Sequence, residues 1–314
     1  MMRHITLVAA GVVAGCISIS GVAAPFFFAD LKDSAVILGA SDEFTEALSP
    51  LDRAVRARVS PPPNQAEFLK YLADQARAWP EREVSRLAPI LSEVSDRLSA
   101  LKVSLPPRIA LVLASERFEE GAPHTRGTAI VIPQSALGAP RDVIRTVLFH
   151  ETFHVLTRSN PALRDELFAL IGYLPCGAVP IPGDLSDRLI TNPDAPRPLH
   201  YIRVSAAGAE ISVVPLLLSP SGANWRQPLF RVFEKQFLRV RRTDKACLPV
   251  GGESAPRLLV PERISGFPEQ VGRNSANEIQ PEEILADNFA LLMTQTPNVP
   301  SPEIIAALRR TLIR

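Results

Sequence analysis

An excess of charge of either sign is missing from this chain of 314 residues. The 34 lysines and arginines nearly balance the 33 aspartates and glutamates, so the formal net charge is only +1. Proteins that bind nucleic acid through a charged surface usually carry a strong basic excess, and we therefore expect no nucleic-acid partner. Hydrophobic residues make up 46% of the chain and charged residues 21%, which is typical of a globular protein with a sizeable core.

Cysteine is also scarce, with three in the whole chain. Cys16 lies in an apolar stretch, residues 5–24, that follows Arg3 and is rich in small residues. This pattern is typical of a secretory signal peptide, so we expect residues 1–24 to export the protein to the periplasm or the medium. Two alternatives remain: the stretch ending at Cys16 resembles a lipoprotein box, or the segment stays uncleaved. Either of these would attach the protein to a membrane.

Export leaves two cysteines, Cys176 and Cys247. In an oxidising compartment an isolated pair favours a disulfide. It would close a loop of about 70 residues and stabilise the fold by roughly 4 kcal/mol in the chain-entropy model. The alternative is two unpaired buried thiols, because a sequence does not show whether two cysteines are close in space.

Histidine is limited to five residues, yet two of them stand four apart in His150-Glu151-Thr152-Phe153-His154. Residues i and i+4 share a face of a helix, so both imidazoles can bind one cation. Glu151 lies beside them, where a carboxylate can take a proton from a metal-bound water. This is the His-Glu-x-x-His arrangement of zinc metallopeptidases. The plainer alternative is an amphipathic helix whose histidines bind nothing.

A third ligand is needed, since catalytic zinc usually has three protein ligands and one open position. The glycine and histidine that metzincins carry after the second histidine are both missing here. Another arrangement places a glutamate on a later helix, with an aspartate four residues on that orients a metal-bound histidine. Among the glutamates after His154, only Glu283 has this partner, in Asp287. Glu282 is the alternative ligand, and a first-turn carboxylate that merely favours the helix dipole is the plainer interpretation of Glu283.

The two stretches together resemble the gluzincin group of zinc metallopeptidases, over about residues 109–172 and 278–293. The resemblance implies that His150, His154 and Glu283 bind Zn²⁺ and that Glu151 is the general base. It also implies that a peptide or protein is the substrate.

Gluzincin-like sites also supply a hydrogen-bond donor to the oxyanion that forms during hydrolysis. Few histidines and tyrosines remain for this role, and His200 and Tyr201 are the best candidates. The alternative is that Tyr201 is simply a packed residue of a strand.

The expected fold class is α+β, with a zincin-like catalytic domain and a β-rich insertion between the metal helix and the third-ligand helix. We expect an N-terminal helical part at residues 25–108 and a core at 109–314, with the insertion at about 174–277. Residues 25–62 carry few signals and leave an inhibitory pro-segment open. Hydrophobic spacing predicts helices from residue 64, over 80–101, up to residue 160, over 161–171 and from 281, and strands over 109–113, 127–132, 201–204, 211–218 and 230–240. The strand at 127–132 is either the sheet edge that binds substrate or an ordinary core strand.

Three functions agree with these patterns. The first is an exported zinc-dependent peptidase. The second is an exported zinc-binding or structural protein that keeps the fold without hydrolysis, although such a protein does not need Glu151. The third is a zinc hydrolase that cleaves another amide, such as a cell-wall link.

Overall fold

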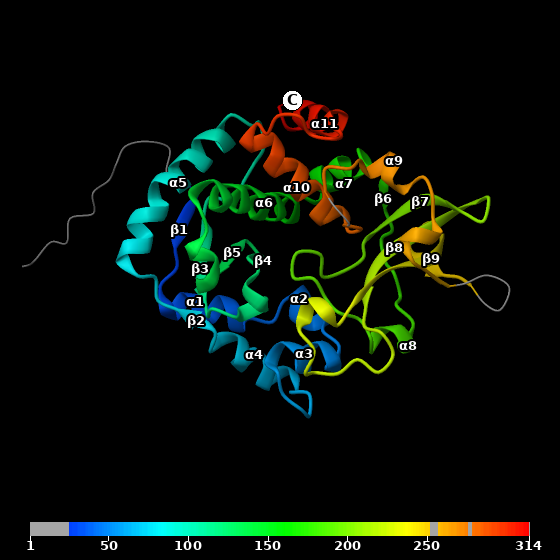
Figure 1. Cartoon of the computed structure of the whole chain (residues 1–314), viewed down its shortest axis with the longest axis horizontal. Coiled ribbons are helices and arrows are strands. Elements are labelled where there is room, and N and C mark those ends of the chain that lie inside the picture. The colour runs from blue at the N-terminus through cyan, green and yellow to red at the C-terminus, as the bar shows by residue number, and fades with distance from the viewer. Residues whose placement is uncertain (1–24, 252–256, 276–277, 314) are drawn as a thin grey trace, which may run out of the picture.

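A computed structural model describes residues 25–251, 257–275 and 278–313. The expectations for residues 1–24, including export and lipidation at Cys16, lie outside the described residues. In the described part the fold is mixed α+β, as the sequence predicts, with two sheets and a layer of helices between them (Figure 1). None of the described helices combines the length and the apolar character needed to cross a membrane.

The first sheet has the strand order β1-β3-β5-β4, with β2 paired to β3. Its strands are β1 Phe26–Phe28, β2 Ala76–Arg77, β3 Ile109–Ala114, β4 His124–Arg126 and β5 Ala129–Pro133. The parallel pairing of β1 with β3 means that the mostly helical N-terminal part shares this sheet with the rest of the chain.

The second sheet has the order β10-β9-β8-β7-β6, with β11 paired to β9. Its strands are β6 Tyr173–Pro175, β7 His200–Ala206, β8 Ala209–Leu218, β9 Glu234–Arg242, β10 Cys247–Pro249 and β11 Leu258–Leu259. All of its pairings are antiparallel. The three strands expected in the β-rich insertion are therefore present as β7, β8 and β9.

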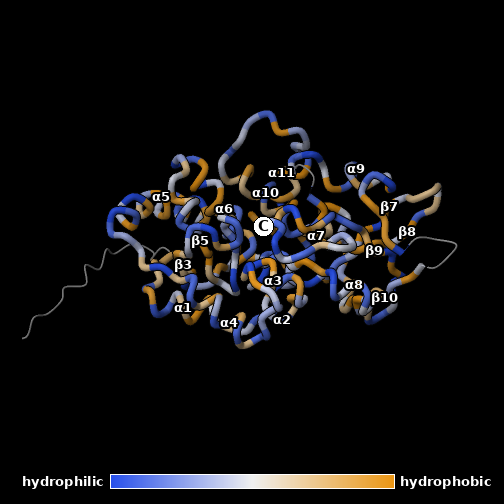
Figure 2. Tube along the Cα trace, turned by 60° about the horizontal axis from the view of Figure 1, so that its bottom comes forward, coloured by the Kyte–Doolittle hydropathy of each residue, from blue (hydrophilic) through white to orange (hydrophobic). Residues whose placement is uncertain are grey.

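The helices cover both sheets and fill the space between them (Figures 1 and 2). They are α1 Leu31–Gly39, α2 Glu43–Ala47, α3 Pro50–Ala57, α4 Gln65–Ala73, α5 Glu81–Ser99, α6 Arg141–Ser159, α7 Pro161–Ala169, α8 Gly183–Ser186, α9 Phe267–Val271, α10 Pro281–Thr294 and α11 Pro302–Leu312. Four of these helices were expected to begin near residues 64, 80, 161 and 281, and they do. The helices α1, α2 and α3 were not expected.

All six residues of strand β3 are buried. Because alternate side chains of a strand point to opposite faces of the sheet, both faces must be covered here. Ile109 and Leu111 belong to the main core, which contains residues of α5, α6 and α10 and extends to the second sheet. Ala110 and Val112 belong to a second core with Phe68 of α4. The first sheet is thus covered by helices on both sides, and α6 lies against its inner face.

Strand β5 is an interior strand, parallel to β3 on one side and antiparallel to β4 on the other. The hairpin that joins β4 to β5 turns at Gly127, whose φ of +56° favours glycine. The edge of the sheet is therefore β4, and the interpretation of residues 127–132 as the edge is wrong. The short polar strand β4 pairs with the outer side of β5 and takes the edge position.

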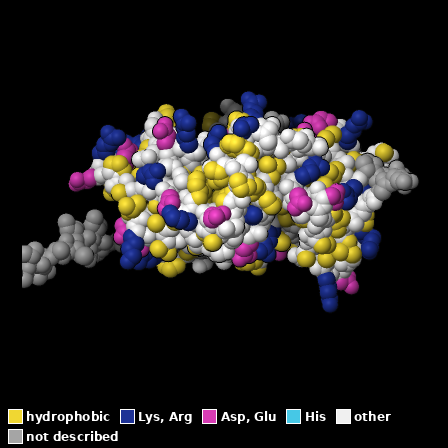
Figure 3. All heavy atoms as spheres, turned by 90° about the horizontal axis from the view of Figure 1, so that it is seen from below, with side chains coloured by type: hydrophobic (Ala, Val, Ile, Leu, Met, Phe, Trp, Pro, Cys, Tyr) yellow, Lys and Arg dark blue, Asp and Glu magenta, His cyan; other side chains and the backbone are white. Residues whose placement is uncertain are grey.

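The cysteine pair forms the expected disulfide between Cys176 and Cys247. It joins the segment after β6 to the start of β10, beside the buried Tyr201 and Leu238. On the face that Figure 3 shows, basic and acidic side chains lie close to one another, with apolar side chains among them.

Replacing both cysteines by alanine should lower the free energy of unfolding by roughly 4 kcal/mol, because the bond restricts a long loop in the unfolded chain. Urea-induced unfolding of the oxidised wild type and of Cys176→Ala/Cys247→Ala measures this difference. The same comparison in reducing buffer is the control, since the two proteins should then unfold alike. A difference below about 1 kcal/mol under oxidising conditions would contradict the prediction.

Candidate metal centre

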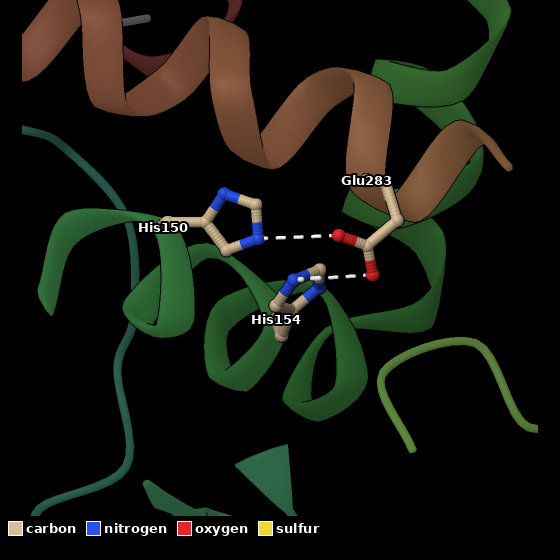
Figure 4. A group of neighbouring side chains, drawn as sticks. All are labelled: His150, His154 and Glu283. Atoms are coloured by element: carbon tan, nitrogen blue, oxygen red, sulfur yellow. Dashed lines mark ion pairs between the residues drawn. The ribbon is translucent and has the colours of Figure 1, made fainter. Parts of the chain in front are cut away.

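Two helices that are far apart in the sequence, α6 and α10, bring the candidate ligands together. His150 and His154 lie one turn apart on α6, and their ring centroids are 4.9 Å from each other. Glu283 lies in the first turn of α10 and points toward both imidazoles (Figure 4). Buried Ala286 and Ala290 allow α10 to approach α6 closely, and the rings of Phe153 and Phe289 pack at 5.4 Å.

The distances suit a single bound cation. His150 Nε2 lies 3.2 Å from Glu283 Oε2, and His154 Nε2 lies 3.8 Å from Glu283 Oε1. Ligand atoms of all three side chains fall within 4.8 Å of one another. Two imidazole nitrogens and one carboxylate oxygen are the donor set of many catalytic zinc sites. The two histidines and Glu283 therefore meet as the sequence predicts.

His154 supplies an independent test of the fit to a metal. Its side chain is only 1% exposed, and neither Nδ1 nor Nε2 has a hydrogen-bond partner among the described residues. A buried polar atom without a partner costs about 1–3 kcal/mol. Burial also lowers the pKa of His154 to about 3, so its imidazole is neutral near pH 7. A neutral ring with a free lone pair is the form that binds a metal.

Asp287 orients His150 from the same face of α10 that carries Glu283. Its Oδ1 lies 3.1 Å from His150 Nδ1, and its Oδ2 accepts a hydrogen bond from Ser275 Oγ. Burial alone would lower the pKa of His150, but the hydrogen bonds to Asp287 and Glu283 outweigh it and raise the pKa well above its usual value. With Nδ1 held by this carboxylate, Nε2 faces Glu283. Many metal-bound histidines are oriented by a carboxylate at the other ring nitrogen in this way.

Glu151 lies on the inner side of α6, against the edge strand β4. Its side chain is buried, and Oε2 accepts a hydrogen bond of 2.9 Å from Thr125 Oγ1. Burial raises the pKa of Glu151 well above that of an ordinary glutamate, and the negative charge of Asp194 raises it further. A carboxylate with a raised pKa and a fixed orientation suits a group that takes and returns a proton near neutral pH.

A loop from the insertion also reaches this site, which the sequence patterns did not predict. Asn192 Nδ2 donates to Glu283 Oε1 at 2.8 Å and to Gln280 Oε1 at 3.0 Å. One carboxylate oxygen of Asp194 lies within 4.8 Å of ligand atoms of both Glu151 and His154. The only local signal is Asn-Pro-Asp, which predicts a turn but not its position in the fold.

Two cavities border the site, and His150 lines both of them. The first, of about 400 Å³, lies between Glu283 and apolar side chains of the insertion. These apolar side chains are Ile190, Leu217, Leu229, Phe230 and Phe233. The second, of about 410 Å³, is bordered by Glu151 and Asp287. Glu283 borders only the first cavity and His154 borders neither, so the site is only partly open.

His200 and Tyr201 are not brought to the site. His200 Nε2 lies 2.9 Å from Asp165 Oδ1, and its ring packs against Phe168 at 4.8 Å. Tyr201 is buried in the small core around the disulfide. Neither side chain lines the two cavities, so their assignment to the oxyanion is wrong. Strand β7 places both inside the second sheet, where they serve packing.

Glu282, the alternative ligand, is not among the described side chains that converge on the histidines. Burial raises the pKa of Glu282 to about 7. Burial also raises the pKa of Tyr173, and the nearby Glu282 carboxylate raises it further. The one-residue step along α10 turns the side chain by about 100°, which separates Glu282 from Glu283.

Comparison of the chain with family models, curated proteins and solved structures found no match.

His124, which borders the first cavity, should make the stability of the protein depend on pH. It is buried, its Nε2 has no hydrogen-bond partner among the residues that the structure describes, and burial lowers its pKa to about 4. The unfolded chain takes up a proton near pH 6.5, but the folded chain does not until about pH 4. Stability is therefore complete above pH 6.5 and falls toward pH 4, by up to about 1.4 kcal/mol per pH unit for this group.

Urea unfolding of metal-free wild type and His124→Gln between pH 7 and pH 4 tests this expectation. Both proteins lose stability as other groups titrate, so the informative quantity is the difference between them. We expect the wild type to fall more steeply. Parallel curves would show that His124 does not keep its lowered pKa.

Proposed function

We propose that the chain is an exported zinc-dependent peptidase with a zincin-like catalytic domain. The observation that carries the proposal is the convergence of His150, His154 and Glu283, where neither nitrogen of buried His154 has a hydrogen-bond partner in the described part of the chain. The His-Glu-x-x-His spacing and the placement of Asp287 behind His150 support it further. The disulfide is consistent with an oxidising compartment outside the cytosol.

Different residues of the chain would bind the metal, orient a ligand and transfer the proton. His150, His154 and Glu283 would hold Zn²⁺, and Asp287 would fix the orientation of the His150 ring. Bound zinc supplies Lewis acidity and lowers the pKa of a coordinated water. Glu151, held by Thr125, would take the proton at its free carboxylate oxygen and pass it to the leaving amine.

The edge strand β4 would set the direction in which an extended peptide binds. A peptide that pairs with β4 would extend the first sheet by one strand and pass beside Glu151. The apolar cavity next to Glu283 would lie beside such a peptide and accept one of its side chains.

Zinc content is the first quantity to measure. Purified wild type should bind about one zinc per chain, as in other mononuclear sites. Glu283→Ala should lose most of it, because a ligand is gone. Glu282→Ala is the matched control one residue away and should keep it. Circular dichroism checks that each variant is folded. Folded wild type that takes up no zinc would contradict the proposal.

Hydrolysis is tested separately with a mixture of unstructured peptides. Glu151→Gln keeps the shape of the side chain and removes the base, so it should retain zinc and lose activity by a factor of at least about 100. Equal hydrolysis by the wild type and this variant would exclude Glu151 as the base. Zinc binding without hydrolysis in the wild type would favour the non-catalytic alternative, and cleavage of cell-wall amides but not peptides would favour the third function.

A further inference from the structure

We propose that residues 191–195, here called the latch loop, hold the candidate site closed, with Asp194 as a fourth ligand for the metal. The proposal rests on the proposed metal site. Two groups of potential ligands are present, His150 with His154 and Glu283, and Glu151 with His154 and Asp194. They share His154, and Asp194 lines the same cavity as His150 and Glu283.

The position of Asp194 is costly without a cation. Its carboxylate lies within 4.8 Å of that of Glu151, which is only 3% exposed. Two carboxylates at such a distance repel each other, most strongly where water is excluded. A divalent cation at His154 would reverse this effect, because both carboxylates would then face a positive charge.

Asp194 also occupies the edge of the sheet. Its Oδ1 accepts a hydrogen bond of 2.8 Å from the backbone amide of Thr125 in β4. A peptide that adds to β4 as a new strand needs the backbone groups of this edge. One side chain thus lies beside the metal position and also takes an edge amide that a substrate would use.

The rest of the latch loop is tied down on both sides of the site. Asn192 Nδ2 donates to Glu283 Oε1, and Arg158 Nη2 donates to the carbonyl of Pro193 at 3.1 Å. At the first residue of the loop, Thr191 N donates to the buried carboxylate of Asp52 at 2.7 Å. Residues 192–194 bond to groups at or beside the site, whereas Thr191 is anchored in a buried network with Asp52 and Arg56. Opening therefore requires movement of residues 192–194 with Thr191 kept in place.

Two substitutions separate the two roles of Asp194. Asp194→Asn keeps an oxygen that accepts from Thr125 but removes the anionic ligand. Asp194→Ala removes both. Asp187→Asn is the matched control, because Asp187 is an exposed carboxylate in the same segment of the insertion. Arg158→Met removes the hydrogen bonds to the backbone carbonyls of Pro193 and Asp194 but leaves the Asp194 carboxylate in place. It replaces the Asp194 variants if they fail to fold.

The probe is imidazole, titrated into the cobalt(II)-substituted proteins and followed by the visible absorption of the metal. Imidazole is neutral at pH 8, so the lost charge of Asp194 does not account for tighter binding. We expect both Asp194 variants to bind it about tenfold more tightly than the wild type, because the competing ligand is gone. Asp187→Asn should match the wild type. Arg158→Met should show a smaller increase.

Peptide hydrolysis by the zinc forms is the second readout. Asp194→Ala should exceed Asp194→Asn, since it also frees the Thr125 amide. Wild type that binds imidazole as tightly as Asp194→Ala would overturn the latch, whatever the activity. An intact difference in imidazole binding with no hydrolysis in any variant would leave the latch standing and remove the peptidase proposal. Folded wild type that binds no cobalt would remove both.

Discussion

The meeting of a carboxylate on α10 with two imidazoles on α6 is the interaction on which the rest of the site depends. Transfer of the Glu283 carboxylate from water into this interface is unfavourable unless positive charge or donors compensate. The two histidines, the amide of Asn192 and the N-terminal end of α10 supply that compensation. Burial raises the pKa of Glu283, but the two neighbouring imidazoles outweigh it and lower the pKa, so the carboxylate is ionised when a cation arrives.

The same contact explains why the core is built as it is. The α6 helix has the first sheet on one side and α10 on the other, so nearly all of its second half is buried. Small residues on α10 set the short distance between the helices, and the aromatic pair Phe153 and Phe289 fills the space beside the ligands. A larger residue at Ala286 or Ala290 would separate the helices and move Glu283 from the histidines.

Features confined to one helix could be predicted from the sequence. The faces of His150 with His154 and of Glu283 with Asp287 follow from helical spacing alone. Helix starts such as Asn64, whose side chain caps the amide of Glu67, follow from local hydrogen bonding. The pairing of α6 with α10 could be predicted only from the resemblance to gluzincins, because spacing within one helix does not show which other helix packs against it.

Features set by distant contacts could not be predicted. An apolar run such as β5 has the same sequence pattern whether the strand lies at the edge of a sheet or in its interior. Here β5 is interior because the short polar strand β4 pairs with its outer side. His200 and Tyr201 were singled out by residue type, but β7 turns them into the second sheet. Asn192 and Asp194 have only a turn signal, and the site they reach is formed by other elements.

The N-terminal helices show why residues 25–62 are unlike a removable pro-segment. Strand β1 pairs with β3, and α3 carries the buried ion pair of Asp52 with Arg56. Arg56 also contacts Glu119 and donates to the carbonyl of Thr191. Removal of this segment would leave Glu119 buried without its cation, which is strongly destabilising. The segment therefore fixes one end of the latch loop. Opening of the site would then require rotation about backbone bonds that follow Thr191.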